Sequence, residues 1–251
     1  CVRQRQRKRE LAASRHALEK SNDELKNTIR ILEQDQQAGR QVQLAMLPNT
    51  PFEVEGYSFQ HAVIPSLYLS GDFTDYFAVG DRYVTFFLSD VSGHGSSSAF
   101  TTVILKNLFA RKRSDYLRRE DDVVCHPSAM LSRANKELID LGISKFATMV
   151  VGVLDLRNNS LRYSVAGHLP LPILSSNHAK PVYLDGDGSP VGLIPSARFE
   201  ESTIDLPDIF TLSLLSDGIL ELLPQPCLVS REESFLESFS GYHSPADELL
   251  S

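Results

Sequence analysis

Two strand-like segments joined by a Gly-Asp turn constrain the fold of this chain more than any other feature. Residues 72–79 (DFTDYFAV) and 82–89 (RYVTFFLS) are rich in aromatic and β-branched residues, which favour strands. Gly80-Asp81 between them is a typical turn pair. The sequence therefore predicts an antiparallel hairpin with an aspartate on each strand at its open end.

The length of the hairpin loop decides how these two aspartates, Asp72 and Asp90, face each other. A three-residue loop centred on Asp81 places them directly opposite, with Cβ atoms ~5 Å apart, whereas a two-residue loop places them on opposite faces unless a bulge intervenes. Facing carboxylates repel, and a bound divalent cation would compensate them. Hard carboxylate oxygens favour Mg²⁺ or Mn²⁺. The alternative is that one or both aspartates point to solvent as turn residues.

The rest of the chain beyond Pro51 alternates strand patterns with helix patterns. Strands are indicated at residues 57–64, 146–156, 161–167 and 209–217, and helices at residues 97–112 and 127–142. The pair Asn158-Asn159 indicates a further hairpin turn. Strand hairpins with only two intervening helices indicate an α+β sandwich of antiparallel sheets rather than a parallel doubly wound sheet.

Leucines recur every seven residues in the N-terminal segment, which contains no Gly or Pro from Val2 to Ala38. They are Leu11, Leu18, Leu25 and Leu32, and the matching a positions are Lys8, Arg15, Asn22, Ile29 and Gln36. This leucine seam with a polar a column predicts a modest parallel coiled-coil dimer. The alternative is a single amphipathic helix that lies on the globular domain. We divide the chain into a helical linker, residues 1–47, and a globular domain, residues 48–251.

Charge and composition exclude several classes of function. Residues 1–40 carry 10 Lys+Arg against 6 Asp+Glu, and residues 41–251 carry 15 against 26, a net of −11. An acidic body argues against nucleic acid as the main partner. The apolar runs are far shorter than the ~20 residues that span a membrane, and no signal peptide is recognised. Three cysteines without a C-x-x-C pair indicate a reducing cytoplasm.

Several short blocks occur in a fixed order along the chain. They are SGDFTDYF and SDVSGHG around the hairpin, FATMVVGVLDL (146–156), YSVAGHLPLPIL (163–174), SPVGL (189–193) and LLSDGILE (214–221). This ordered set, over roughly residues 42 to 225, resembles the PPM (protein phosphatase type 2C-like) Ser/Thr phosphatases of the SpoIIE/RsbU branch. The long helix that runs into AMLPNTP resembles the linker between a receiver domain and such a phosphatase in RssB-type response regulators.

The resemblance implies a metal-dependent αββα sandwich, two antiparallel sheets flanked by helices, that hydrolyses phosphoserine or phosphothreonine on proteins. Asp90 matches the aspartate that bridges two metal ions, and the carbonyl of Val91 matches a neighbouring ligand. Asp217 matches a further metal aspartate, and Asp72 the acidic residue that binds one metal directly or through water. We therefore expect Asp72, Asp90 and Asp217 to be catalytic, with two Mn²⁺ or Mg²⁺ ions that activate a bridging water.

The chain departs from the family pattern at several points. Serines replace the usual glycines at Ser70 and Ser89, and Thr74 replaces a common aromatic residue. The family ends with an Asp-Asp-x-Thr strand that supplies the last metal carboxylate, whereas this chain stops at SPADELLS, which resembles the preceding helix. Either the chain is truncated or disordered there, or the site lacks a ligand. Because the chain also begins at Cys1 rather than Met, we expect it to be a piece of a longer protein.

Two histidines lie in the matching blocks, and we expect both to have structural roles. His94 shapes the loop after the hairpin, and His168 anchors its own loop by hydrogen bonds.

The resemblance leaves two functions to weigh. The first is a response-regulator output phosphatase whose substrate is a phosphorylated anti-sigma antagonist of the STAS type, with a receiver domain upstream and a homodimer through the N-terminal helix. The second is a PPM-fold adaptor with an impaired metal site that binds a regulatory partner such as a sigma factor. The retained aspartates favour the enzyme, because an adaptor has no reason to keep repelling carboxylates together. A purely structural dimeriser leaves the phosphatase blocks unexplained.

Overall fold

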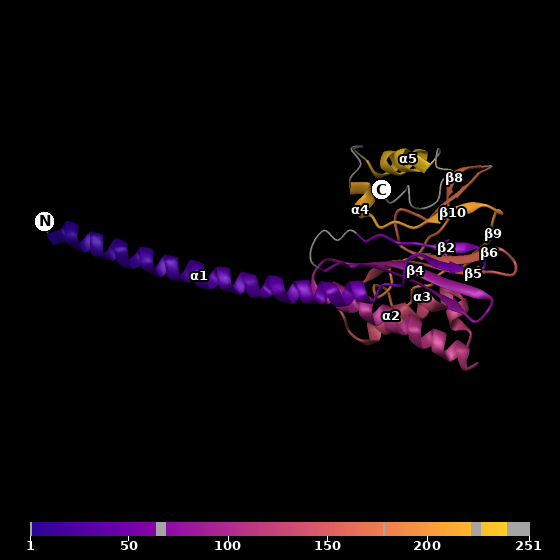
Figure 1. The fold of residues 1–251 in the computed structure, drawn as a ribbon, viewed down its shortest axis with the longest axis horizontal. Coiled ribbons are helices and arrows are strands. Elements are labelled where there is room, and N and C mark those ends of the chain that lie inside the picture. Colours follow the sequence, from indigo (N-terminus) through magenta and orange to yellow (C-terminus); the bar gives the residue numbers. More distant parts are fainter. Residues whose placement is uncertain (1, 64–68, 178, 222–226, 240–251) are drawn as a thin grey trace.

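The globular part of the chain is a sandwich of four layers (Figure 1). The structure, a computed structural model, describes residues 2–63, 69–177, 179–221 and 227–239. Helices α2 (Ser96–Leu117) and α3 (Pro127–Asp140) cover one side of the paired sheets, and α4 (Gly218–Glu221) and α5 (Leu228–Ser238) lie on the other. The prediction of an α+β, αββα sandwich is confirmed.

The larger sheet is antiparallel throughout and contains the predicted hairpins. Its order is β3 (Asp72–Val79), β4 (Tyr83–Val91), β5 (Ala147–Asp155), β6 (Ser160–Ala166) and β9 (Ser202–Asp205). The loop between β3 and β4 has three residues, since Val79 pairs with Tyr83. The register is therefore the first of the two alternatives, in which the aspartates at the open end are directly opposite.

The second layer of strands is smaller and is made of two pieces. One is the sheet β10 (Phe210–Ser213), β7 (Ile173–Ser176) and β8 (Ala179–Tyr183), and the other is the ribbon of β1 (Phe52–Val54) and β2 (Tyr57–Phe59).

Two predicted strands are shorter than expected. The strand predicted at 57–64 ends at Phe59, and the one predicted at 209–217 ends at Ser213. In both cases the next pairing position across the ladder is a proline, Pro51 and Pro172 respectively. Proline has no N–H to donate, so neither ladder can be extended.

Successive side chains of β4 point to opposite faces of the sheet and pack into two separate hydrophobic cores. Phe87, fully buried, faces the helices and stacks on Phe109 of α2 at a centroid distance of 4.1 Å. Its neighbour Phe86 points to the opposite face, into the core between the two strand layers, because successive side chains of a strand alternate. A Cβ at Gly152 would lie 2.1 Å from the Phe86 ring, so only glycine fits opposite it. A third core, around Ile173, holds α4 and α5 on the second sheet.

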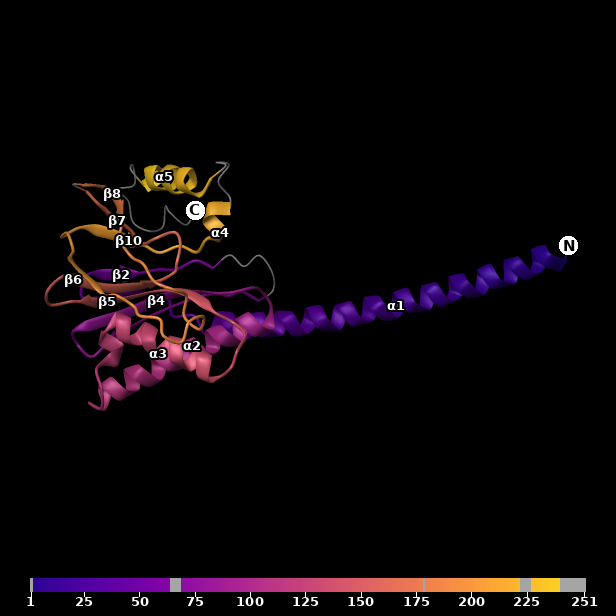
Figure 2. The ribbon, with the colours of Figure 1, turned by 180° about the vertical axis from the view of Figure 1, so that it is seen from behind.

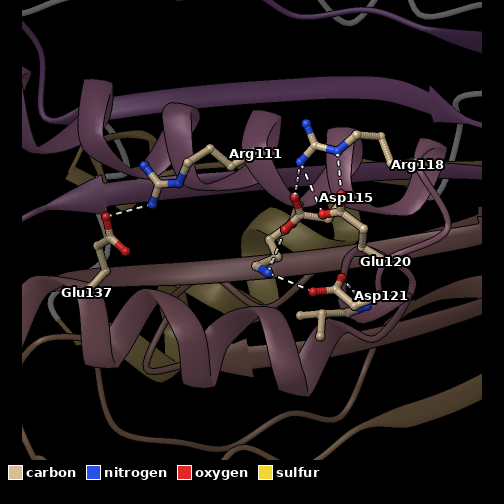
Figure 3. A network of polar contacts seen from close by, with 8 residues as sticks. Arg111, Asp115, Arg118, Glu120, Asp121 and Glu137 are labelled. Carbon is tan, nitrogen blue, oxygen red and sulfur yellow. Dashed lines mark hydrogen bonds and ion pairs between the residues drawn. The ribbon is translucent and has the colours of Figure 1, made fainter.

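Ion pairs hold the outer helical layer together, and Figure 3 shows this network. Arg111 of α2 contacts Glu137 of α3 at 2.7 Å, and Lys112 contacts both Asp115 and Asp121 at 2.7 Å. All of these side chains except Asp121 line a groove of about 590 Å³ between the two helices. Because all of these charges lie near the C-terminal half of α2, the network stabilises the layer away from the open end of the β3–β4 hairpin.

Helix α1 (Val2–Ala45) extends away from the globular body (Figures 1 and 2). The predicted seam leucines are exposed by 72% at Leu11, 72% at Leu18, 58% at Leu25 and 55% at Leu32. The alternative of a helix lying along the domain is therefore wrong for this part of the chain. Dimerisation through the seam stays a prediction. Within the described residues, no helix combines the length and apolarity that crossing a bilayer requires.

Candidate metal centre

Asp72 and Asp90 form the centre of the candidate site. Asp72 is the first residue of β3 and Asp90 the last but one of β4, and the two are direct partners across the ladder. The chain approaches itself closely here: the Val91 N–H donates to the Gly71 carbonyl at 3.1 Å, and a Cβ at Gly71 would lie 2.5 Å from the Val91 carbonyl oxygen. Glycine at this position therefore allows the two strand ends to lie side by side.

The facing carboxylates are electrostatically unfavourable. Burial, the charges of Asp72 and Asp217, and a hydrogen bond with Asp72 together raise the pKa of Asp90 to about 7. An aspartate with this pKa is about half protonated at neutral pH. A proton on Asp90 therefore reduces the repulsion between the two carboxylates, as a bound cation would.

Asp217 reaches the same end of the sandwich from the second sheet. After β10 ends, the chain runs through residues 214–216 to Asp217, in the turn before α4. Ser216 donates a hydrogen bond from its hydroxyl to Asp72 Oδ2 at 2.8 Å. Asp217 is exposed, and its charge contributes to the raised pKa of Asp90. Asp217 thus lies at the same end of the sandwich as the facing pair, in the turn that follows the second sheet.

His168 holds the segment before Asp217 against the larger sheet. It is buried, its Nε2 bonds the Leu215 carbonyl at 2.9 Å, and its Nδ1 lies 3.1 Å from the Thr148 hydroxyl. Burial lowers the pKa of His168 below its ordinary value, against the opposing effect of the Leu215 carbonyl. The ring is therefore neutral, with Nε2 donating and Nδ1 accepting. The prediction that His168 anchors its loop by hydrogen bonds is confirmed, while His94 is exposed in the loop after β4.

The last turn of α1 also supports the site, which the sequence analysis missed. Gln43 is buried, its Oε1 accepts from the Ser70 N–H at 3.1 Å, and its Nε2 donates to the Ser70 carbonyl at 2.8 Å. The same Nε2 lies 3.3 Å from the Thr102 hydroxyl of α2. Ser70 precedes Asp72 by two residues, so Gln43 ties the long helix to the start of β3. A glutamine in a polar helix gives no pattern that would identify it.

A second missed residue, Lys145, fixes the loop that follows β4. Its ammonium donates to the Ser92 carbonyl at 2.8 Å, and the Ser98 hydroxyl of α2 donates to the same oxygen at 3.1 Å. The Ser92 N–H donates to the carbonyl of Phe146, the residue before β5, at 2.8 Å, and the Phe146 N–H donates to the Ser92 hydroxyl at 3.2 Å. The loop beside Asp90 is thereby attached to both α2 and β5.

The chemistry of these donors fits a hard divalent cation such as Mn²⁺ or Mg²⁺, which prefers carboxylate oxygens. Asp72 and Asp90 supply a facing pair, with the Val91 backbone beside them. Among the described residues, no group of three His, Cys, Asp or Glu side chains is close enough to hold a metal ion. Asp217 therefore stands apart from the pair, although it lies at the same end of the sandwich.

A profile of the family described as Stage II sporulation protein E (SpoIIE) matches residues 80–251, which is more than half of the chain. The chain belongs to the SpoIIE family. The matched region includes Asp90, Val91 and Asp217, whereas Asp72 lies just before it and is placed by the pairing of β3 with β4.

Two curated relatives are similar to this SpoIIE-family chain. Protein IcfG of Synechocystis sp. is 25% identical over 247 residues, which cover 90% of this chain and 38% of the relative. Phosphoserine phosphatase RsbP of Bacillus subtilis is 24% identical over 158 residues, which cover 61% of this chain and 37% of the relative. The chain thus spans less than two fifths of the length of either protein.

Solved structures show the same fold. The SiaA-PP2C domain of Pseudomonas aeruginosa superposes with a TM-score of 0.61 at 16% identity, over 86% of this chain and 93% of that one. The PP2C phosphatase domain of SpoIIE from Bacillus subtilis superposes with a TM-score of 0.57 at 18% identity, over 70% of this chain and 48% of that one. The RsbU and RsbW domains of Rv1364c from Mycobacterium tuberculosis superpose with a TM-score of 0.56 at 25% identity, over 70% of this chain and 46% of that one. The chain is a PP2C-type phosphatase domain of the SpoIIE/RsbU branch, as its sequence blocks predict.

Proposed function

We propose that this chain is a metal-dependent protein serine/threonine phosphatase that acts as the output domain of a response regulator. The observation that carries the proposal is the facing pair of Asp72 and Asp90, with the pKa of Asp90 raised to about 7. Carboxylates that repel each other weaken a sheet, so their retention in this register favours a site that binds cations. Asp217, at the same end of the sandwich, adds a third carboxylate.

The proposed reaction is hydrolysis of a phosphoserine or phosphothreonine ester, in which water attacks phosphorus and the side-chain oxygen leaves. When bound, two Mn²⁺ or Mg²⁺ ions would supply an activated water and neutralise phosphoryl charge. Asp72, Asp90, Asp217 and the Val91 carbonyl are the proposed ligands. Ser216 orients the Asp72 carboxylate, and His168 holds the segment that carries Asp217.

The substrate we propose is a phosphorylated anti-sigma antagonist of the STAS type. This assignment is supported by similarity to a protein named phosphoserine phosphatase RsbP and to a structure that joins an RsbU domain to an RsbW domain. The upstream partner we propose is a receiver domain, and the exposed leucine seam of α1 is the proposed contact of a homodimer. Such a chain would work in the cytoplasm.

A second candidate function is that of an adaptor with the same fold and an impaired metal site, which binds a regulatory partner such as a sigma factor. It is favoured by one observation, the absence of a complete three-carboxylate cluster among the described residues. The segment SPADELLS (residues 244–251), which resembles the helix that precedes the family's final metal-ligand strand, lies outside the described residues.

Activity of the full chain in Mn²⁺ separates the two functions. We expect hydrolysis of p-nitrophenyl phosphate and of a phosphorylated STAS-domain antagonist, and loss of both with Asp90→Ala. Asp81→Ala is the matched control, because Asp81 is exposed in the loop at the other end of the same hairpin. If a protein extended beyond Ser251 is also inert with both substrates, the adaptor is the better description.

A further inference from the structure

The outer helical layer is basic, although the globular body as a whole is acidic. Residues 96–141, which form α2, α3 and the segment between them, carry 8 Lys+Arg against 6 Asp+Glu. The other residues between 41 and 251 carry 7 against 20. Such a separation of charge creates a local positive potential, so an anionic ligand is attracted to this layer rather than to the rest of the body.

The groove between α2 and α3 collects most of these basic side chains. Its lining contains five of the eight, namely Arg111, Lys112, Arg118, Arg133 and Lys136. We call it the basic groove. Its volume of about 590 Å³ lies within the range of small-molecule sites in proteins, ~300–1,000 Å³. The groove is therefore large enough to hold a ligand of the size of a metabolite.

Two of the five basic side chains have no carboxylate partner. Arg133 and Lys136 lie one turn apart on α3, both are exposed, and within the described parts of the chain neither makes an ion pair. Lys112, by contrast, is neutralised by two carboxylates at 2.7 Å. Asp140 is a lining carboxylate that also makes no ion pair with the described residues. The unpaired side chains of the basic groove thus leave a net positive charge.

The two arginines of α2 are paired but keep unused donors (Figure 3). Arg111 donates from Nη2 to Glu137 at 2.7 Å. Arg118 donates from Nε and Nη2 to Glu120 and Asp115, at 2.8 to 3.2 Å. A guanidinium has five N–H donors, and among the described residues these two make no further hydrogen bond. Each can therefore bind an anion without breaking its ion pairs.

We propose that the basic groove binds a small polyanion with two or more linked phosphate groups, such as a polyphosphate or the phosphate chain of a nucleotide. Its cations lie on both walls. Arg111 and Arg118 are two turns apart on α2, ~10 Å at 1.5 Å per residue, and Arg133 and Lys136 line the α3 wall. A single phosphate reaches few of these groups, whereas linked phosphates reach several, and guanidinium groups bind phosphate oxygens in pairs.

Other anionic partners fit the basic groove less well. An amphipathic helix needs a row of apolar contacts, but the leucines of the lining are Leu108, which is buried, and Leu141. A long nucleic acid would extend over the rest of the body, where 20 acidic residues outnumber 7 basic ones and would repel it. A compact polyanion meets neither obstacle. The site lies outside the candidate metal centre, and the proposal does not depend on the phosphatase function.

Isothermal calorimetry with inorganic triphosphate tests the proposal. The full chain is titrated in excess chelator, so that metal ions bound by the aspartates cannot hold the probe. We expect a Kd of about 1 mM or tighter for wild type, with weaker binding as salt is raised. Arg133→Gln with Lys136→Gln should weaken binding by about 10-fold or more, because it removes two charge-assisted contacts. Both side chains are exposed, so this variant should unfold at the temperature of wild type when no ligand is present.

Arg119→Gln with Lys180→Gln is the matched control. Both side chains are exposed and lie outside the lining of the basic groove, so the control removes the same net charge from the chain. We expect it to bind triphosphate as wild type does. Equal losses of affinity in the two double variants would show only a general attraction to charge and would overturn the proposal.

The remaining outcomes are equally decisive. Absence of binding by wild type would overturn the proposal, and so would unchanged binding by Arg133→Gln with Lys136→Gln, which would place the anion elsewhere, for example at the basic residues 3–9 of α1. ATP as a second probe identifies the source of the phosphates. Tighter binding of ATP than of triphosphate assigns the groove to a nucleotide, and equal or weaker binding assigns it to the phosphate chain alone; both support the proposal. None of these results bears on the proposed phosphatase function, because every titration is made without metal.

Discussion

Asp72 and Asp90 lie directly opposite each other at the open end of the β3–β4 hairpin, and the pKa of Asp90 is raised to about 7 by burial and by the charge of Asp72. A fold that places two carboxylates in this position weakens its own sheet in the absence of a cation. The site therefore links metal binding, protonation and stability, and each of these can be measured.

The first prediction concerns the stability of the metal-free protein. The pKa of Asp90 is near 4 in the unfolded chain and about 7 in the folded one, so the folded state holds the extra proton and loses relative stability as pH rises from about 4 to about 7. We expect Asp90→Asn to remove this loss and to stabilise the protein by about 1–2 kcal/mol at pH 8 in chelator, less than the full pKa shift implies because the site is open to solvent.

Thermal unfolding between pH 4 and pH 8 with a chelator measures this effect. Adding Mn²⁺ should reverse the order, so that wild type becomes the more stable protein. Equal pH profiles for wild type and variant would contradict the prediction.

The second prediction concerns metal affinity. Asp90→Asn should lower Mn²⁺ affinity by about 100-fold or more, and Asp217→Asn by about 10-fold, because Asp217 is exposed and stands apart from the facing pair. Wild-type affinity should increase as pH rises through about 7, since the bound proton competes with the cation. Isothermal calorimetry is the measurement, with Asp81→Asn as control; the two-metal proposal fails if Asp90→Asn binds as wild type does.

The third prediction concerns the support of Asp72 by α1. Gln43→Leu removes two hydrogen bonds to the Ser70 backbone and leaves those polar groups unpaired, at a cost of about 1–3 kcal/mol. We expect lower stability and weaker Mn²⁺ binding. Gln41→Leu is the control, because Gln41 is exposed on the same helix. A Gln43 variant with unchanged Mn²⁺ affinity would mean that the helix does not support the site.

The fourth prediction concerns the leucine seam. Because Leu18 and Leu25 are exposed in the single chain, Leu18→Asp with Leu25→Asp should preserve the fold but prevent dimerisation and make activity insensitive to an upstream domain. Light scattering and circular dichroism measure mass and helix content, with Ser21→Asp as a control outside the seam. An unchanged mass together with retained regulation would show that α1 is only a tether.

The fifth prediction concerns the turns far from the candidate site. Arg82 donates to both oxygens of Asp155, at 2.6 to 3.1 Å, and with the backbone N–H groups of Arg157 and Asn158 lowers the pKa of Asp155 below its ordinary value. The stability that this provides is present above about pH 4 and is lost as pH falls further.

Asp155→Asn should therefore cost about 2 kcal/mol at pH 7, and the difference should shrink below pH 4. Urea unfolding at pH 3 and pH 7 tests it, with the exposed Asp205→Asn as control. Catalysis should be unaffected, because the turn lies at the opposite end of the strands from Asp90. A difference that does not become smaller as pH falls would contradict the lowered pKa of Asp155.

Local patterns in the sequence were sufficient to place the hairpins and the long helix. Aromatic and β-branched residues and the Gly-Asp turn indicated β3 and β4 to within two residues, and the absence of Gly and Pro from Val2 to Ala38 indicated α1. Ordered blocks around Asp90 and Asp217 identified the phosphatase fold. These features depend on neighbours in the chain, and a single sequence records them directly.

Contacts between distant segments were decided only by the tertiary structure. The sequence left open whether Asp72 faces Asp90, because lengthening or shortening the loop by one residue moves every following side chain to the opposite face of the sheet. It also gave no sign that Gln43 is buried against Ser70, or that Pro51 and Pro172 end two ladders, since each depends on which residue lies opposite in space. Sheet register and the burial of a lone polar residue are set by packing between elements far apart in the chain, so no local pattern records them.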